Sequence, residues 1–307
     1  MRKSVFFAML ICCLWLIMPG LGEIVELPVD TSPGLAYDWD KYQTENGYCD
    51  PSLSIEVYQD TLYDTEYMYA LVKIATPAQL RTAVAYKYNS DYTATALKMA
   101  EANNAVLAIN ADYYSFNDSG HIVRQGHTYR RRAYKEWDVL LIDQNGDFHT
   151  LHEPSRAGVA AWLEEHPEIT VINSFNFGPV FIENGERTME KFTDALNSMS
   201  IRGHARFART VICQLDTPLT YLCMTCQGDQ DGKGVGFTYE QIYDCLRAIE
   251  EKLPDGLKIK TAYNLDGGYS ASMIMHGKRI NWPENGVNRA IADIIYFASA
   301  WQEEEKT

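Results

Sequence analysis

A stretch near the C-terminal end of the chain, NLDGGYSAS at 264–272, sets a lone carboxylate beside a glycine pair. Glycine loses the most backbone entropy on folding, so a glycine pair is typical of a sharp bend or of a close approach to the backbone. An ordinary turn between two strands accounts for the same letters. The functional interpretation is that Gly267 and Gly268 clear space for a substrate beside Asp266 and leave their N–H groups free to meet an anion.

Other short polar clusters lie at the ends of apolar, strand-like runs, where functional sites are often built. AINADYY at 108–114 puts two polar side chains directly after such a run, and GHIVRQG at 120–126 carries an arginine between glycines. HARFARTVI at 204–212 and GVNRAIADI at 286–294 each place an arginine where a strand begins. Taken singly, these residues are equally well explained as turn residues or surface arginines. The candidate residues of the clusters and of the glycine stretch are Asn110, Asp112, Arg124, Arg209, Asn264, Ser270, Asn288 and Arg289.

Alternating strand and helix patterns must bring these clusters together. Apolar runs bounded by turn residues predict strands at 67–75, 105–110, 137–143, 261–265, 271–275 and 290–297. Helices are predicted at 91–104 and 239–253; Thr238 and Gln241 form a capping box before the second, and Pro254 ends it. This content predicts an α+β fold, a single domain over 48–302 with a mixed, mostly antiparallel β-sheet and a few packed helices.

The first 22 residues have the pattern of an export signal. Arg2 and Lys3 precede the apolar run VFFAMLICCLWLIM, and small residues follow, so cleavage is expected after Gly22. The run is short for a spanning helix, and an uncleaved anchor is the alternative. Residues 23–47 are predicted to be a linker or an irregular lead-in, and 303–307 a polar tail. The mature chain is therefore expected to be secreted or extracytoplasmic, at the cell envelope, with no transmembrane helix.

Charge and cysteine content argue against a nucleic-acid-binding protein and against a small domain held together by disulfides. The chain carries 27 basic and 41 acidic residues, and loss of the signal lowers the net charge from −14 to about −16. Nucleic-acid binding depends on Lys and Arg contacts to phosphate, so no nucleic-acid partner is expected, and the basic run at 130–132 is interpreted as a solvated loop.

Five cysteines remain after cleavage, and the odd count excludes full internal pairing. CMTC at 223–226 has zinc-site spacing but continues a strand-like run, so buried thiols are predicted and zinc is the minor alternative.

The order and spacing of the clusters resemble the phosphodiester glycosidase domain family. The matching pieces, between about residues 100 and 298, are AINADYY, GHIVRQG, FGPVFIENG, ARTVI, GVGFTYEQI, NLDGGYSAS and NRAIADI. The piece NLDGG followed by a hydroxyl is the most specific. The chain departs from the family pattern at Ala111 and Asp112, which replace two glycines, and at Tyr269 and Ala271, which replace a glycine and a serine. Tyr269 adds a bulky ring where the family keeps the backbone bare, which affects the substrate more than the fold.

The resemblance implies a hydrolase that cleaves a sugar-1-phosphodiester at the anomeric carbon and releases a sugar and a phosphomonoester. Phosphate is already a good leaving group, so the site needs cations for the phosphate and a carboxylate for the developing oxocarbenium ion. Asp266 is the first choice for this carboxylate and Asp112 the second. Arginine binds phosphate oxygens in a bidentate manner, which makes Arg124, Arg209 and Arg289 the candidate cations, with Arg209 placed among the catalytic groups.

The other predicted residues bind the substrate, a carbohydrate phosphate from a glycan or a cell-envelope polymer. Asn110 and Asn264 would hold sugar hydroxyls or orient the acid, Ser270 would add a hydroxyl donor, and Asn288 would contact the substrate beside Arg289. No cofactor and no metal are predicted. The oligomeric state, the sugar and the leaving group are not predicted by the sequence.

Two alternatives come from other classes of protein. The same acids and amides suit a divalent cation, which would make the protein a metal-dependent phosphodiesterase that cuts the P–O bond. His121, His127 and His204 lack the spacing of metal ligands. The second alternative is a non-catalytic protein of envelope-polysaccharide binding or assembly, because fold does not fix function.

Overall fold

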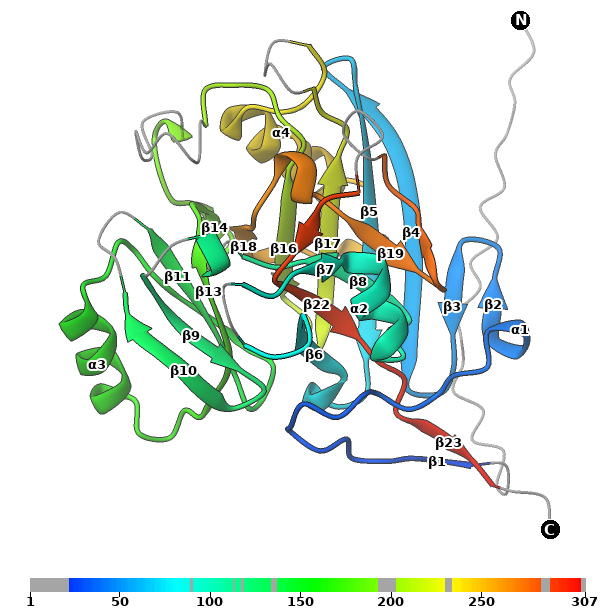
Figure 1. Ribbon diagram of the computed structural model, residues 1–307. Coiled ribbons are helices and arrows are strands. Elements are labelled where there is room, and N and C mark those ends of the chain that lie inside the picture. The colour runs from blue at the N-terminus through cyan, green and yellow to red at the C-terminus, as the bar shows by residue number, and fades with distance from the viewer. Residues whose placement is uncertain are drawn as a thin grey trace, which may run out of the picture.

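The computed structural model describes residues 22–88, 91–112, 114–116, 119–133, 137–192, 203–229, 234–282 and 288–304 (Figure 1). The expected export signal lies outside these residues, apart from Gly22. No helix in the described part of the chain is both long and apolar enough to cross a membrane. Every pairing between described strands is antiparallel.

A nine-stranded sheet with the order β15-β14-β18-β16-β17-β5-β4-β3-β2 forms the largest layer. Its strands are β2 (Gln43–Thr44), β3 (Gly47–Cys49), β4 (Leu53–Leu62), β5 (Thr65–Ile74), β14 (Val180–Glu183), β15 (Glu186–Arg187), β16 (Thr210–Leu215), β17 (Thr220–Cys226) and β18 (Ile259–Asn264). Helix α4 (Tyr239–Glu250) packs on this layer through Ile242, Leu246 and Ile249, which are fully buried. Its capping box forms as predicted, since Thr238 and Gln241 each accept a hydrogen bond from the other's backbone N–H.

A five-stranded sheet with the order β20-β19-β8-β22-β6 faces the same core. Its strands are β6 (Leu80–Val84), β8 (Leu107–Asn110), β19 (Met273–Met275), β20 (Lys278–Arg279) and β22 (Asp293–Phe297). Helix α2 (Ala96–Ala102) lies against β8 and β22, and a short ribbon joins β7 (Ala94–Thr95) to β21 (Ala290–Ile291). Short 3₁₀ turns occupy Pro77–Gln79, Tyr114–Phe116, Pro254–Gly256 and Gly268–Ser270.

A smaller sheet and a ribbon flank the two main sheets. The sheet has the order β12-β11-β13, and the ribbon pairs β9 with β10 and lies beside β13. The elements are β9 (Gly120–Arg124), β10 (His127–Arg132), β11 (Asp138–Asp143), β12 (Phe148–Leu151), β13 (Val171–Phe177) and α3 (Arg156–Glu165). Side chains fasten β9 to β13, because Ser174 accepts from the Val123 N–H and Asn176 accepts from the His121 N–H, both at 2.8 Å.

The lead-in before residue 48 packs onto the domain. Strand β1 (Gly22–Ile24) pairs with β23 (Trp301–Glu303), and α1 (Trp39–Tyr42) precedes the hairpin of β2 and β3. Arg81 of β6 is fully buried and donates to the carbonyls of Pro28, Asp30 and Ser32. A buried arginine needs its N–H groups satisfied, so the lead-in is held to the five-stranded sheet at this point.

The predicted fold class is confirmed, because the elements form one α+β arrangement of mostly antiparallel sheets. Several bounds differ from prediction. Helix 91–104 is only seven residues long, and helix 239–253 ends at Glu250. The strands predicted at 105–110 and 271–275 each begin two residues later, and strand 290–297 is two strands, β21 and β22, interrupted at Ala292.

Helix α3, strands β4, β6 and β13 and the ribbon β9/β10 were not predicted. The interpretation of the basic run at 130–132 as a loop was wrong, because these residues end strand β10 and pair with β9. Among the apolar residues of α3 only Val159 is buried, and the three alanines are exposed, so its apolar stripe is weak.

Candidate active site

The candidate residues converge where β8, β16, β18 and β22 meet. Asn110 at the end of β8 ties them together: its Nδ2 donates to the Asp266 carbonyl at 2.7 Å, and its Oδ1 accepts from Thr210 Oγ1 at 2.8 Å and from the Ser272 N–H at 2.9 Å. The side chain is thus occupied by protein groups. It joins the five-stranded sheet to the nine-stranded sheet and fixes the loop that carries Asp266.

Asp266 follows β18 and is buried, with 9% of its surface exposed. Burial raises the pKa of its carboxyl from 3.8 to about 6, against the lowering effects of Ser270, the Gly267 N–H and Arg289. The Ser270 hydroxyl thus lies close to the carboxyl, although its Oγ makes no hydrogen bond of good geometry. A carboxyl with this pKa changes protonation near neutral pH, as a catalytic acid or base requires.

A buried ion-pair network lies beside Asp266. Arg124 Nη2 contacts Asp112 Oδ1 at 3.0 Å and Asp293 Oδ2 at 2.6 Å, and both carboxylates have fully buried side chains. Both oxygens of Asp112 are used, since Oδ1 also accepts from the Tyr114 N–H and Oδ2 accepts from the Asn176 N–H at 2.9 Å. The structure therefore places Asp112 and Arg124, both predicted to act on the substrate, in internal contacts.

Asp293 is the third acid of this cluster. Burial raises the pKa of its carboxyl; the Arg124 guanidinium opposes this, while Asp112 and Asp266 act in the same direction as burial. Two carboxylates that share one guanidinium carry an excess negative charge, so retention of one proton is favoured. Asp293 Oδ1 has no hydrogen-bond partner in the described structure, which leaves a position for that proton.

Asn264 and Arg209 lie around the ring of Tyr239, which is close enough to Asp266 for its charge to affect the Tyr239 pKa. Asn264 Nδ2 donates to the Gly178 carbonyl at 2.7 Å and to the Tyr239 hydroxyl at 3.2 Å. The Arg209 guanidinium lies 4.7 Å from the centre of the Tyr239 ring and donates to the Phe237 carbonyl. Burial raises the pKa of Tyr239 to about 12, Arg209 opposes this, and Asp266 acts with burial. All four side chains therefore share one electrostatic environment.

The N–H groups of Gly267 and Gly268 are hydrogen-bonded within the protein, contrary to prediction. The Gly267 N–H donates to Asp266 Oδ1 at 2.8 Å, and the Gly268 N–H donates to the Ala208 carbonyl at 2.7 Å. The prediction that these N–H groups are free for an anion was therefore wrong. A Cβ at residue 267 would lie 2.5 Å from Ala208 O, and Gly268 has a φ of +58°. The glycines are needed because the chain turns tightly against the segment before β16.

The two late candidates, Asn288 and Arg289, lie nearer the surface. Asn288 is exposed and accepts from Arg279 Nη1 at 2.7 Å. Arg289 is half-buried and lowers the pKa of Asp266, so its charge lies close to that carboxyl. Of the three predicted phosphate-binding arginines, Arg289 is the one that combines partial exposure with proximity to Asp266, since Arg124 and Arg209 are both buried.

Unsatisfied polar atoms gather around Asp266. Seven buried side-chain polar atoms lack a partner in the described part of the chain, and three of them are Asn264 Oδ1, Ser270 Oγ and Asp293 Oδ1. A buried polar atom without a hydrogen bond is costly, and such atoms cluster where a ligand supplies the missing partner. An amide oxygen, a hydroxyl and a carboxyl oxygen that can hold a proton match the hydroxyl groups of a sugar.

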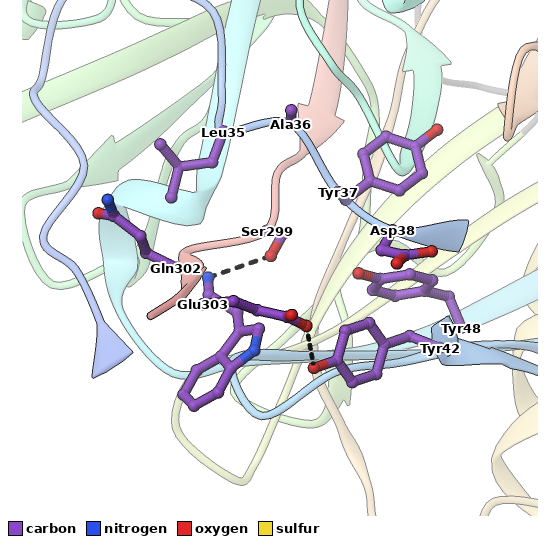
Figure 2. Close-up of a pocket in the computed structure, with 10 residues that line it drawn as sticks. Leu35, Ala36, Tyr37, Asp38, Tyr42, Tyr48, Ser299, Gln302 and Glu303 are labelled. Carbon is purple, nitrogen blue, oxygen red and sulfur yellow. Dashed lines mark hydrogen bonds between the residues drawn. The ribbon is translucent and has the colours of Figure 1, made fainter. Parts of the chain in front are cut away.

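Four cavities of the described structure lie elsewhere; none of them is lined by Asp266, Asn264, Ser270 or Asp293, and Arg124 lines one of them. Figure 2 shows one of about 290 Å³ between the lead-in and β23, where the Tyr42 hydroxyl donates to Glu303 at 2.9 Å. In the described ranges, no group of three His, Cys, Asp or Glu side chains has the geometry of a metal site. The four cysteines 213, 223, 226 and 245 are buried free thiols, as predicted, and Cys49 is half-buried.

Two residues of the site were missed from the sequence. Asp293 is the one charged residue in the apolar run AIADIIYF, and an acid in a buried strand is a usable signal. Tyr239 opens the helix after the capping box and lies in the piece GVGFTYEQI, but the pattern there was used only to predict the helix.

The chain matches one protein-family model and is similar in fold to several solved structures. A family model described as phosphodiester glycosidase matches residues 103–298, which is more than half of the chain. Among solved structures, the catalytic domain of zebrafish N-acetylglucosamine-1-phosphodiester alpha-N-acetylglucosaminidase, auto-inhibited by its pro-peptide, has a TM-score of 0.64 at 15% identity, over 84% of this chain and 87% of that chain. A hypothetical protein from Synechocystis has a TM-score of 0.51 at 15% identity, over 80% of this chain and 62% of that chain. No curated protein sequence matches the chain.

Proposed function

Because the chain belongs to the phosphodiester glycosidase family, we propose that it hydrolyses a sugar-1-phosphodiester at the bond between the anomeric carbon and the bridging oxygen. Water adds to the anomeric carbon, the C–O bond breaks with its electrons passing to the phosphate, and a free sugar and a phosphomonoester leave. The observation that carries this proposal is the group of three unsatisfied polar atoms around the buried carboxyl of Asp266.

Asp266 is proposed as the carboxylate that faces the anomeric carbon. Its ionised form would stabilise the oxocarbenium-like transition state or act directly on the anomeric carbon. Asn264 Oδ1 and Ser270 Oγ flank it in sequence and lack partners, so they suit sugar hydroxyls of the bound substrate. Burial of the carboxyl strengthens its interaction with a developing positive charge, because little water screens it.

Arg289 is proposed to bind the phosphate. Its guanidinium is half-buried and already interacts with Asp266, which places positive charge near the bond to be cleaved. The leaving phosphomonoester gains negative charge in the transition state, and a charge-assisted contact with arginine stabilises that charge.

The Asp112–Arg124–Asp293 network is proposed to position the site. Arg124 is enclosed by two carboxylates, the Val123 carbonyl and the Phe175 ring, whose centre lies 4.6 Å from the guanidinium carbon. These contacts hold the end of β9, the loop after β8 and the start of β22 in one arrangement. Asn110 and Arg209 act in the same way, since each is buried and bonded to backbone groups.

We further propose that the substrate is a glycan or a cell-envelope polymer outside the cytoplasm. The basic and apolar pattern of the first 22 residues supports export.

Hydrolysis of UDP-N-acetylglucosamine in ¹⁸O-water tests the proposed reaction. The expected products are free sugar and UDP without ¹⁸O in the UDP phosphate, unaffected by EDTA. Asp266→Asn should lower turnover by at least about 10³-fold, whereas Asp255→Asn, at an exposed acid, should not. Sugar-1-phosphate and UMP with ¹⁸O in phosphate, lost in EDTA, would instead assign P–O cleavage. If no member of a UDP-sugar and phosphoglycan panel is turned over, a binding role replaces catalysis.

A further inference from the structure

Two adjoining cavities on the β9/β10 side of the molecule are lined by tyrosines and basic side chains. One, of about 490 Å³, is lined by Tyr88, Tyr129, three arginines of β10 and one of α3. The other, of about 610 Å³, shares Tyr88 and Tyr129 and includes Lys87 and Lys98. Figure 1 shows β10 and α3 on the same side of the molecule. We call the two together the basic groove.

The basic groove concentrates positive charge in an acidic protein. The arginines of its smaller cavity are Arg130, Arg131, Arg132 and Arg156, and no acidic residue lines either cavity. Arg130 is anchored, since its Nη1 donates to the Ser119 carbonyl at 2.6 Å. Arg131, Arg132 and Arg156 are exposed and form no ion pair with a residue that the structure describes. The chain as a whole has a net charge of −14, which repels polyanions from most of its surface. The basic groove is the positively charged exception, so it would attract an anionic ligand.

A stack of tyrosine rings connects the basic groove to the carboxylate cluster. The Tyr88 ring lies between those of Tyr129 and Tyr114, with ring centres 4.2 and 4.9 Å apart. The Tyr114 ring lies 5.6 Å from the guanidinium of Arg124, which itself lines the larger cavity. Tyr88 has a buried hydroxyl without a partner. The Tyr88 hydroxyl can donate a hydrogen bond to an oxygen of a bound ligand, and the arginines suit phosphate.

We propose that the basic groove is an accessory subsite for a second phosphate of the substrate. The substrate class is then a glycan with repeated phosphodiester links: one phosphodiester is cleaved beside Asp266 while another is held by Arg131, Arg132 and Arg156. This inference rests on the proposed function and narrows it from single sugar phosphodiesters to polymers of them. Nucleic acid also carries repeated phosphates, but the stacked rings of Tyr88 and Tyr114 and the guanidinium of Arg124 join the groove to a site whose unpaired groups match sugar hydroxyls.

The test compares a ligand that carries one phosphodiester with a ligand that carries several. The probes are the methyl phosphodiester of N-acetylglucosamine-1-phosphate and an oligomer of four such sugars joined by 1-phosphodiester links. The variant is Arg131→Gln/Arg132→Gln/Arg156→Gln, and its control, Lys73→Gln/Lys258→Gln/Lys278→Gln, removes the same charge from exposed sites elsewhere. Binding is measured by calorimetry in the Asp266→Asn background, and KM and kcat are measured in the active enzyme.

The expected result is that the arginine variant binds the oligomer at least about tenfold more weakly, with a matching rise in KM, unchanged kcat and unchanged handling of the single phosphodiester. If the arginine variant loses no more affinity for the oligomer than the lysine control does, the proposed subsite is wrong, even if hydrolysis is observed. Arginine-dependent binding without hydrolysis supports the subsite and removes only the proposed reaction. Equal, arginine-dependent affinity for a single-stranded oligodeoxynucleotide overturns the assignment to a glycan.

Discussion

Asp266 is a carboxyl that folding removes from water, and the consequence is measurable in stability as well as in rate. Its pKa of about 6 lies above the ordinary 3.8 because burial disfavours the charged form. Below about pH 3 the group is protonated in the folded and unfolded states alike. Between about pH 4 and 6 the unfolded chain loses this proton first, so the group makes the folded state progressively less stable as pH rises.

The prediction for Asp266→Asn is therefore a gain in stability that depends on pH. The variant should exceed the wild type in unfolding free energy by about 2–3 kcal/mol at pH 8, because two pKa units separate the folded and unfolded states, and by only about 0.5 kcal/mol at pH 4. Urea denaturation at pH 4, 5, 6 and 8 measures the difference. A variant less stable than the wild type at pH 8 would show that Arg289 and the Gly267 N–H outweigh burial.

At the scale of elements, the site depends on a tight crossing between the loop after β18 and the segment before β16. Gly267 lies against the Ala208 carbonyl, and the Gly268 N–H donates to the same oxygen. A side chain at 267 has no space, so either the loop or the strand entrance must shift. Since Asp266 precedes this glycine, the shift moves the carboxyl out of line with Asn264 and Ser270.

Gly267→Ala should therefore lower kcat by about 10²-fold or more and the unfolding free energy by about 1–3 kcal/mol. Gly158→Ala in α3 is the matched control, because its Cβ would meet nothing closer than 3.5 Å and alanine favours a helix; it should be neutral or stabilising. Steady-state kinetics and urea denaturation of both variants provide the comparison. Normal turnover by Gly267→Ala would contradict the tight crossing.

At the scale of the molecule, the lead-in stabilises the sheet that carries Asn110 and Asp293. Arg81 has no exposed surface and donates to three lead-in carbonyls, to the Ala78 carbonyl and to the Tyr296 hydroxyl. Leu27 adds an apolar contact to the core cluster that contains Tyr296. Residues 23–47 therefore act as part of the domain.

A chain that begins at residue 35 should unfold at lower temperature than one that begins at residue 23, because three carbonyl partners of a buried guanidinium are lost. The expected loss is about 3 kcal/mol or more in unfolding free energy. Removing residues 304–307 from the chain that begins at 23 is the control and should leave the melting temperature unchanged. Equal melting temperatures for the two starting points would show that water satisfies Arg81 equally well.

Local sequence pattern was enough to predict several strands and the longest helix. Strands β5, β8, β11, β18 and β19 and helix α4 follow from apolar runs, turn residues and one capping box, because these signals act within a few residues of each other. The fold class followed from the same patterns, and the acid at 266 was singled out from its glycine neighbours.

Only the tertiary structure decided what each polar side chain contacts. Asn110, Asp112 and Arg124 lie in sequence clusters that suit a substrate, yet protein groups from β13, β22 and the loop after β18 occupy them. Asp293 and Tyr239 lie in segments that the sequence analysis had singled out, yet neither residue was predicted to belong to the site. Hydrogen bonds and charges act over a few ångströms in space regardless of separation along the chain, so the partners of a buried polar group are fixed by how the sheets pack.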